Sequence, residues 1–202
     1  NVTGLNPNTP YTLTIKAVNG DHVTNETDVS NVSIYTLGII ASASAAAVTA
    51  SAASLTIDGS YATFNILSDG TTLLSDASGI SCDVTGLNPN TSYTLSIQAV
   101  NGDHVTNETD VSNVAIYTLG VISEASSSNI TPYSVTLTVS GSYYLFNVSD
   151  GTSIIMSDVS GTICDISGLV PDTQYTLIVE PINGNSDVGT ATQSVTFSTL
   201  AA

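Results

Sequence analysis

Apolar and polar residues alternate along much of this chain, and the alternation predicts β-strands. Between Tyr93 and Ala99, apolar residues stand at every second position and mostly polar residues fill the positions between them. Segments 11–17 and 175–179 repeat the pattern. A period of two places successive side chains on opposite faces of a strand, so one face of each strand is expected to lie against a core. The chain is therefore predicted to be all-β.

Two further strands are predicted from shorter alternating patterns. One covers residues 61–66 and is expected to direct Ala62 inward together with the other even-numbered residues. Another runs through Ile80, Cys82 and Val84, which stand at every second position. All of these side chains are expected to contribute to the core.

The alanine- and serine-rich segment 41–53 is predicted to form strands rather than a helix. Its counterpart at 126–138 carries Val135 and Leu137 in alternation and Pro132 at a position that suits a strand edge or a bend. Because the two segments occupy the same place in a repeat, we assign the same strands to both.

A ten-residue motif recurs at a fixed spacing of 82 residues. It begins at Gly4, Gly86 and Gly168 and reads Gly-Leu-x-Pro-x-Thr-x-Tyr before an alternating segment. Residues 2–40 and 84–122 differ at only five of 39 positions. Near-identity at a fixed period indicates a tandem-repeat protein.

The motif has the chemistry of a turn that leads into a strand. Pro89 restricts the backbone, and Asn90 and Thr91 are expected to hydrogen-bond to nearby backbone groups. β-Sandwiches place a tyrosine at such a corner, with its hydroxyl bonded back to the chain. The corner tyrosines are predicted to be Tyr11, Tyr93 and Tyr175.

On these residues the chain resembles tandem fibronectin type III modules, which are immunoglobulin-like β-sandwiches. The resemblance implies a partial module at 1–37, holding the end of strand E and strands F and G, and full modules at 38–119 and 120–202. Because the chain contains no tryptophan, tyrosine, phenylalanine and aliphatic residues are expected to fill the core. A half module leaves one apolar face and its sheet edges uncovered.

The charge balance excludes several classes of partner. Lys16 is the one basic residue against 17 acidic ones, and the net charge is −16. Nucleic acids and anionic membrane surfaces both bind through lysine and arginine, so neither is an expected partner. No apolar run is long enough to cross a membrane. One lysine also excludes a lysine–asparagine isopeptide staple in every repeat. The polar but weakly charged composition is typical of extracellular and cell-surface proteins.

The two cysteines lie at equivalent positions of different repeats. Cys82 and Cys164 are 82 residues apart, and each stands in an alternating apolar pattern. A buried thiol is one interpretation, and a disulfide between subunits is the other. One thiol per repeat does not suit a metal site.

The segments 19–31 and 101–113 are predicted to be solvated loops between the last two strands of a module. The second contains Asp103, Glu108 and Asp110, whose oxygens suit calcium, although their spacing does not match an EF-hand loop. A histidine lies in each loop, but no nucleophile motif accompanies it, so no catalytic residue or cofactor is assigned.

Seven N-glycosylation sequons occur, about as many as chance gives in a chain this rich in serine and threonine. Several fall in predicted loops, and Asn147 is expected to point away from the core residues beside it. The candidate sites for covalent N-glycans are Asn25, Asn31, Asn90, Asn107, Asn129 and Asn147.

Three functional hypotheses remain open. The first is a structural subunit of an extracellular filament, fibre or surface stalk of a microbe, with copies of itself or further repeats as partners and with strand complementation as one route to assembly. The second is an adhesin that recognises a receptor or a carbohydrate through the loops. The third is a spacer in a larger secreted enzyme. None gives this chain an enzymatic activity of its own.

Overall fold

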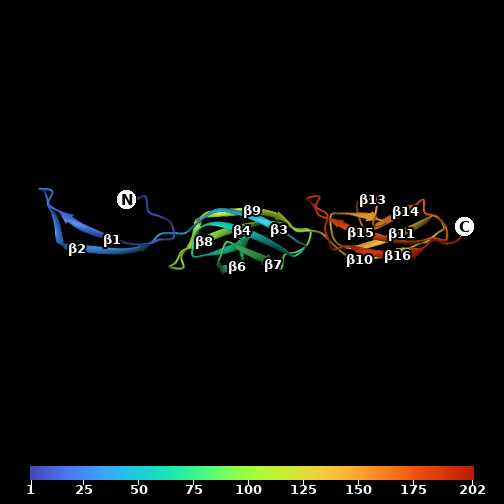
Figure 1. Cartoon of the computed structure of the whole chain (residues 1–202), viewed down its shortest axis with the longest axis horizontal. Coiled ribbons are helices and arrows are strands. Elements are labelled where there is room, and N and C mark those ends of the chain that lie inside the picture. Colours follow the sequence, from blue (N-terminus) through green and yellow to red (C-terminus); the bar gives the residue numbers. More distant parts are fainter. The chain divides into compact units, whose positions relative to one another are not determined.

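The computed structural model describes residues 1–202, and all of its regular structure is β-strand, which confirms the all-β prediction (Figure 1). Its 16 strands form five sheets, one of two strands, two of three and two of four. Neighbouring strands pair in the antiparallel sense, for example β1 with β2, β5 with β8 and β12 with β15. Short turns connect them, which suits a chain whose repeats share one pattern of alternation.

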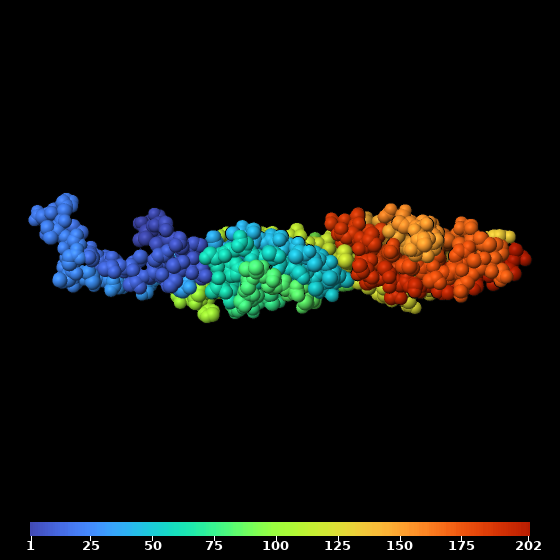
Figure 2. All heavy atoms as spheres, in the orientation of Figure 1, coloured from blue at the N-terminus to red at the C-terminus, as the bar shows by residue number.

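Residues 1–37 form a two-stranded sheet of β1 (Pro10–Val18) and β2 (Thr24–Tyr35). Tyr11 pairs with Ile34 across this sheet. On the face seen in Figure 2, no second layer of chain covers this hairpin, drawn in blue. Ile15 is 57% exposed and Val32 is 41% exposed, so the apolar face of the hairpin lies open.

The second repeat contains a three-stranded sheet in the order β3-β4-β7 and a four-stranded sheet in the order β6-β5-β8-β9. The central strands bury alternate residues: Phe64 and Ile66 in β5 and Leu95 and Ile97 in β8 are all fully buried. The strands are β3 (Ile39–Val48), β4 (Ala52–Ser60), β5 (Thr63–Ser68), β6 (Thr71–Ala77), β7 (Ser81–Thr85), β8 (Ser92–Val100) and β9 (Thr106–Tyr117).

The third repeat has the same two sheets, in the orders β10-β11-β14 and β13-β12-β15-β16. Side chains from both sheets form one core, which includes Leu137, Phe146 and Leu177. Two packed sheets around such a core make a β-sandwich. The strands are β10 (Val121–Ser128), β11 (Ser134–Ser142), β12 (Leu145–Ser149), β13 (Ile154–Val159), β14 (Ile163–Ser167), β15 (Gln174–Ile182) and β16 (Gln193–Ser198).

Tyrosine and phenylalanine supply the aromatic part of both cores. Tyr61 meets Phe64 edge to face at 5.5 Å between ring centres, and Tyr143 meets Phe146 in the same way at 5.6 Å. Each tyrosine hydroxyl also donates to backbone carbonyl groups, so its polar end is satisfied. Burial raises the pKa of both hydroxyls. These pairs fill the space in a chain that has no tryptophan.

The prediction that the side chains of Ala62 and Ile80 point into the core is wrong. Ala62 is exposed, because β5 begins only at Thr63. Ile80 is 73% exposed, since it lies in the turn before β7 and therefore outside the alternation of that strand. Alternation predicts a face only where the chain is already extended.

The predicted ranges of the loops, 19–31 and 101–113, are longer than the loops in the structure. β2 begins at Thr24 and β9 at Thr106, so most of both segments belongs to a strand. Their threonine, valine and acidic residues alternate weakly, and pairing with the neighbouring strand decides their conformation.

Internal contacts divide the chain into two compact units, and their boundary runs through the repeat 38–119. The module boundaries expected at 37/38 and 119/120 stay a prediction. One unit comprises Asn1–Ser44, Leu55–Cys82 and Thr94–Val114, and the other comprises Ala45–Ser54, Asp83–Tyr93 and Ala115–Ala202.

Candidate functional site

Each tyrosine of the repeated motif closes its corner through the hydroxyl group. The Tyr93 Oη accepts a hydrogen bond from the Asn88 N–H at 2.8 Å. Thr118 binds the same corner, because its Oγ1 donates to the Asn88 carbonyl at 2.6 Å and accepts from the Thr91 N–H at 2.9 Å. The corner is thereby joined to the end of β9. The other two repeats make the tyrosine bond at 2.9 Å, from Asn6 to Tyr11 and from Val170 to Tyr175.

Replacing Tyr93 with phenylalanine should lower the free energy of unfolding by about 0.5–1.5 kcal/mol, because the Asn88 N–H loses its acceptor. Urea denaturation measures the change. Tyr144→Phe is the matched control, since Tyr144 is 64% exposed and makes no such bond, and it should leave the stability unchanged. Equal effects of the two variants would show that the corner bond adds nothing to the folded state.

The loop that follows β8 is organised by the side chain of Asn101. Its Oδ1 accepts hydrogen bonds from the N–H groups of Asp103 and Val105, at 3.0 and 2.9 Å. The Asn101 carbonyl accepts from the His104 N–H, and His104 adopts a φ of 60°. All of the Oδ1 capacity is used inside the loop, so the Nδ2 group is directed outward to another partner.

This loop contacts the end of the preceding repeat. The Asn101 Nδ2 donates to the Thr36 carbonyl at 3.1 Å, and the Gly102 N–H donates to the Asn8 Oδ1 at 3.1 Å. The Tyr35 ring lies against Gly102, where a Cβ atom would come within 2.6 Å of the Tyr35 Cζ. Glycine is favoured here by close approach, since a side chain at this position would displace the Tyr35 ring.

The same contacts recur 82 residues later. The Asn183 Nδ2 donates to the Thr118 carbonyl at 3.2 Å, and the Gly184 N–H donates to the Asn90 Oδ1 at 3.0 Å. Tyr117 takes the place of Tyr35 and lies against Gly184. We call this set of contacts, a tyrosine ring on an Asn-Gly loop with two hydrogen bonds, the clasp. Asn90 therefore bonds to a distant residue, which corrects the expectation of a local bond.

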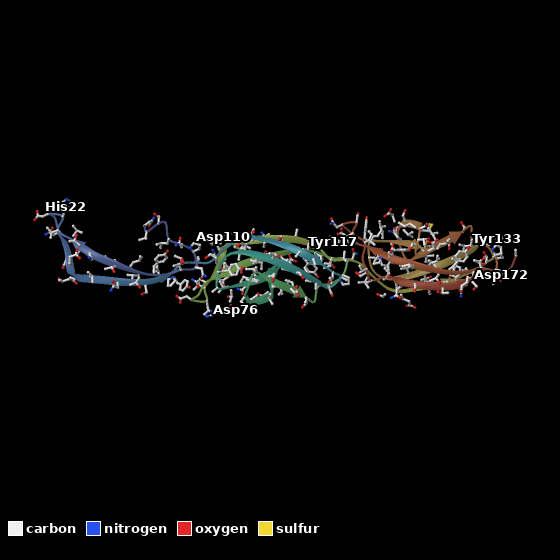
Figure 3. All side chains as sticks on the ribbon, viewed as in Figure 1. His22, Asp76, Asp110, Tyr117, Tyr133 and Asp172 are labelled. Atoms are coloured by element: carbon white, nitrogen blue, oxygen red, sulfur yellow. The ribbon has the colours of Figure 1, made fainter.

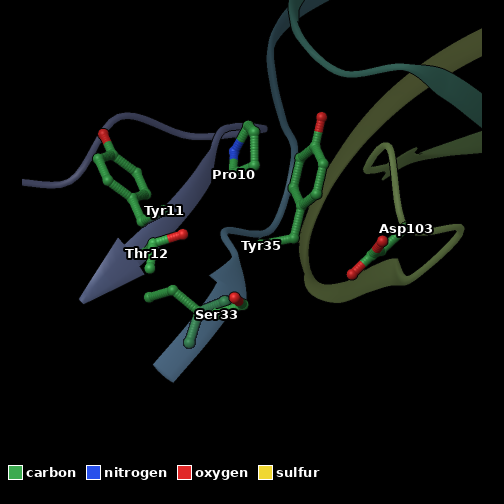
Figure 4. Close-up of a pocket in the computed structure, with 7 residues that line it drawn as sticks. Pro10, Tyr11, Thr12, Ser33, Tyr35 and Asp103 are labelled. Atoms are coloured by element: carbon green, nitrogen blue, oxygen red, sulfur yellow. The ribbon is translucent and has the colours of Figure 1, made fainter. Parts of the chain in front are cut away.

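A shallow hollow lies beside the first clasp (Figure 4). It has a volume of about 420 Å³ and is lined by residues of β1 and β2 together with Asp103. A smaller hollow of about 220 Å³ occupies the equivalent position near Tyr117, where Asn185 replaces the aspartate. Neither hollow brings together groups that suit catalysis.

Residues 102–105 are exposed, as expected of a solvated loop, whereas the expectation is wrong for Asn101 and Asn107. Asn101 is 1% exposed and Asn107 is 5% exposed. The Asn107 Nδ2 donates to the Gly38 carbonyl at 2.7 Å. These two side chains bond to backbone carbonyl groups of the preceding repeat and connector, and the sequence around them carries no sign of those contacts.

The candidate glycosylation sites differ in their accessibility. Asn107 is buried and bonded, and Asn147 is 8% exposed with its Oδ1 accepting from the Asp158 N–H at 3.0 Å. Asn147 is expected from the sequence to point away from the core residues beside it, and its side chain is nevertheless covered, because it bonds to Asp158 in the neighbouring strand β13. Asn90 is half-buried within the second clasp. The exposed candidates are Asn25, Asn31 and Asn129.

The other candidate residues do not assemble into a site. No group of three or more histidine, cysteine, aspartate or glutamate side chains is placed to hold a metal ion. His22 lies at the tip of the β1–β2 hairpin (Figure 3). Cys164 is buried, which raises the pKa of its thiol, and Cys82 is half-buried. Lys16 forms an ion pair with Glu26 on the neighbouring strand.

The carboxylate of Asp150 accepts several hydrogen bonds from the residues that follow it. Its Oδ1 accepts hydrogen bonds from Thr152 Oγ1 and from the N–H groups of Thr152 and Ser153, at 2.7–2.8 Å. These bonds lower the pKa of Asp150 from 3.8 to about 2, and the bond from the Thr152 hydroxyl has the largest effect. Three donors favour the ionised form of a carboxylate.

Asp150→Asn should therefore change the acid stability of the chain. A lowered folded pKa contributes stability that is present above pH 3.8 and lost as the pH falls toward 2. The difference in unfolding midpoint between wild type and Asp150→Asn should be constant at neutral pH, should shrink from about pH 4 downward and should disappear only below about pH 2. A difference at about pH 2 that is as large as the difference at neutral pH would contradict the prediction.

The chain is similar to known proteins in sequence and in structure. No family model matches the chain. The receptor-type tyrosine-protein phosphatase eta of Gallus gallus is 30% identical over 195 residues, which cover 88% of this chain and 14% of that receptor. A two fibronectin type-III domain segment from chicken tenascin superposes with a TM-score of 0.52 at 20% identity, over 79% of this chain and 99% of the segment. The chain consists of tandem fibronectin type III-like β-sandwiches. The phosphatase activity in the receptor's name belongs to that protein, of which this chain spans a small part.

The structure contains no helix long and apolar enough to span a membrane.

Proposed function

We propose that this chain is a structural part of an extracellular filament, fibre or surface stalk built from repeated fibronectin type III-like modules. The observation that carries the proposal is a contrast between two nearly identical segments. Ile97 is fully buried, whereas its counterpart Ile15 is 57% exposed. Val114 is 7% exposed, whereas its counterpart Val32 is 41% exposed. The apolar face of the β1–β2 hairpin has the composition of a core and is not covered by other strands of residues 1–202.

The partner that fits this face is a half module with the sequence pattern of residues 38–82. In the second repeat, that segment supplies β3 to β6 and the start of β7 next to β8 and β9. Strand addition of this kind satisfies the open sheet edge through backbone hydrogen bonds and covers the apolar face at the same time. A partner of the same repeat type makes the proposed assembly one of like modules.

The extracellular location is supported by composition and by similarity. The chain carries one basic residue and a surface rich in serine, threonine and asparagine. The protein of Gallus gallus that it matches is named as a receptor. We include N-glycans as partners, at the exposed sequons only.

Glycan mapping by mass spectrometry after secretion from a glycosylating cell should find occupancy at Asn25, Asn31 or Asn129. Asn107 and Asn147 should carry none, because their side chains are buried and bonded in the folded chain. A glycan at Asn107 in the folded protein would contradict the contacts that it makes.

The alternative is a spacer or a binding segment in a larger receptor or secreted enzyme. It is favoured by the match to 14% of a long receptor. In the loop 101–105, Asn101 and the Gly102 N–H are engaged by the preceding repeat, which leaves the exposed side chains of residues 103–105 for recognition of a partner. In either case the proposed role is non-catalytic.

A lengthened chain tests the proposal. A second copy of residues 1–82 is placed before residue 1, which supplies the half module at the expected spacing. Amide hydrogen exchange should then show β1 and β2 of the original chain as strongly protected as β8 and β9. The unmodified chain is the control, and its β1–β2 hairpin should exchange rapidly. If the hairpin stays unprotected in the lengthened chain, the partner is not a half module of this repeat.

A further inference from the structure

The loop at the tip of the β1–β2 hairpin has the conformation of the two clasp loops. The Asn19 Oδ1 accepts from the N–H groups of Asp21 and Val23 at 3.0 and 2.9 Å, as Asn101 does in its own loop. The His22 N–H donates to the Asn19 carbonyl at 3.0 Å, and His22 adopts a φ of 59°. The loop is therefore preformed without the contacts that its counterparts make.

Three groups in this loop lack the partners that its counterparts have. The Asn19 Nδ2 is exposed, whereas the Asn101 Nδ2 donates to a backbone carbonyl of the preceding repeat. The Gly20 N–H has no counterpart of the bond from Gly102 to an asparagine Oδ1. No atom lies within 4 Å of a Cβ built on Gly20, whereas a tyrosine ring lies against Gly102. Nothing in the first repeat requires glycine at position 20.

We propose that the loop 19–23 is a docking site for the carboxy-terminal end of another module of this repeat. The partner presents a tyrosine ring to Gly20, an asparagine Oδ1 to the Gly20 N–H and a backbone carbonyl to the Asn19 Nδ2. These are the three groups that Tyr117, Asn90 and Thr118 present to the third repeat. The inference rests on the proposed assembly of like modules and specifies which end of one module meets the next.

The end of the third repeat does not carry this set. Ser198 pairs with Gln174, as Tyr35 pairs with Pro10, so serine stands where the clasp needs a tyrosine. Asp172 stands at the position of Asn8 and Asn90 and adds a negative charge opposite a loop that contains an aspartate. The clasp is thus selective, because modules that end in tyrosine and asparagine bind the loop and the third repeat does not.

The test uses the full chain on both sides. Wild-type chain labelled with ¹⁵N is titrated with unlabelled Asp172→Asn/Ser198→Tyr chain, which recreates the tyrosine end. The NMR signals of the Gly20 amide and the Asn19 side-chain amide should move, saturably, toward the positions of the Gly102 and Asn101 signals in the same spectrum. Concentrations of about 1 mM are appropriate, because a contact that normally acts within one chain is weak between chains.

Unlabelled wild type is the first control and should leave both signals in place. Labelled Gly20→Ala chain is the second, and its Asn19 signal should no longer respond. Fixed Asn19 and Gly20 signals, or equal shifts with wild-type titrant, would overturn the inference. Shifts confined to the strands of the hairpin would also overturn it while supporting completion of the sheet, so the two ideas fail separately.

Discussion

Ile97→Ala should lower the free energy of unfolding of the second repeat by about 2–5 kcal/mol, because it removes a fully buried side chain and leaves a cavity. Ile15→Ala, the same substitution in a nearly identical segment, should change stability by less than about 0.5 kcal/mol, since Ile15 is 57% exposed. Hydrogen exchange in β8 and β5 reports on the second repeat alone, which avoids treating the whole chain as one two-state unit.

The same two substitutions, made in the lengthened chain, test whether the added half module covers the hairpin. Once a half module covers β1 and β2, Ile15→Ala should become about as costly as Ile97→Ala, on the order of 2–5 kcal/mol. Ile80→Ala is a suitable control in both chains, because that side chain is 73% exposed and should cost little in either. If Ile15→Ala already costs as much as Ile97→Ala in the unmodified chain, its apolar face is covered in solution by some other partner.

Gly184→Ala is expected to open the second clasp. The added methyl group would lie 2.7 Å from the Tyr117 Cζ, so the ring must move away from the loop. Such overpacking lowers the free energy of unfolding by about 1–3 kcal/mol. Displacement of the ring should also weaken the hydrogen bonds from Gly184 to Asn90 and from Asn183 to Thr118. Urea denaturation gives the loss of stability, and the NMR shift of the Asn183 side-chain amide reports whether its bond survives.

Gly20→Ala is the matched control within the same chain. It introduces the same methyl group into a loop of the same conformation where no atom lies within 4 Å. No loss of stability is expected for the unmodified chain. An equal loss in Gly184→Ala and Gly20→Ala would mean that alanine strains the loop itself, and the tyrosine would then not be the reason for glycine.

Local sequence chemistry determined a large part of this structure. Alternation of apolar and polar residues predicts β8 and β15, because a strand turns successive side chains to opposite sides whatever lies around it. The Gly-Leu-x-Pro-x-Thr-x-Tyr motif likewise predicts a corner, and the Tyr93 hydroxyl bonds to a group only five residues away. The fixed 82-residue period indicates that these units recur.

Tertiary structure alone decided where those elements are covered. Ile15 and Ile97 stand in nearly identical segments, yet one is exposed and the other buried, because burial depends on strands that lie elsewhere in the chain. Asn101 looked like a solvated loop residue and is buried against Thr36, 65 residues away. The contact of Gly102 with Asn8 spans 94 residues. Sequence periodicity carries information about a strand and its near neighbours, and the clasp is formed by groups that only folding brings together.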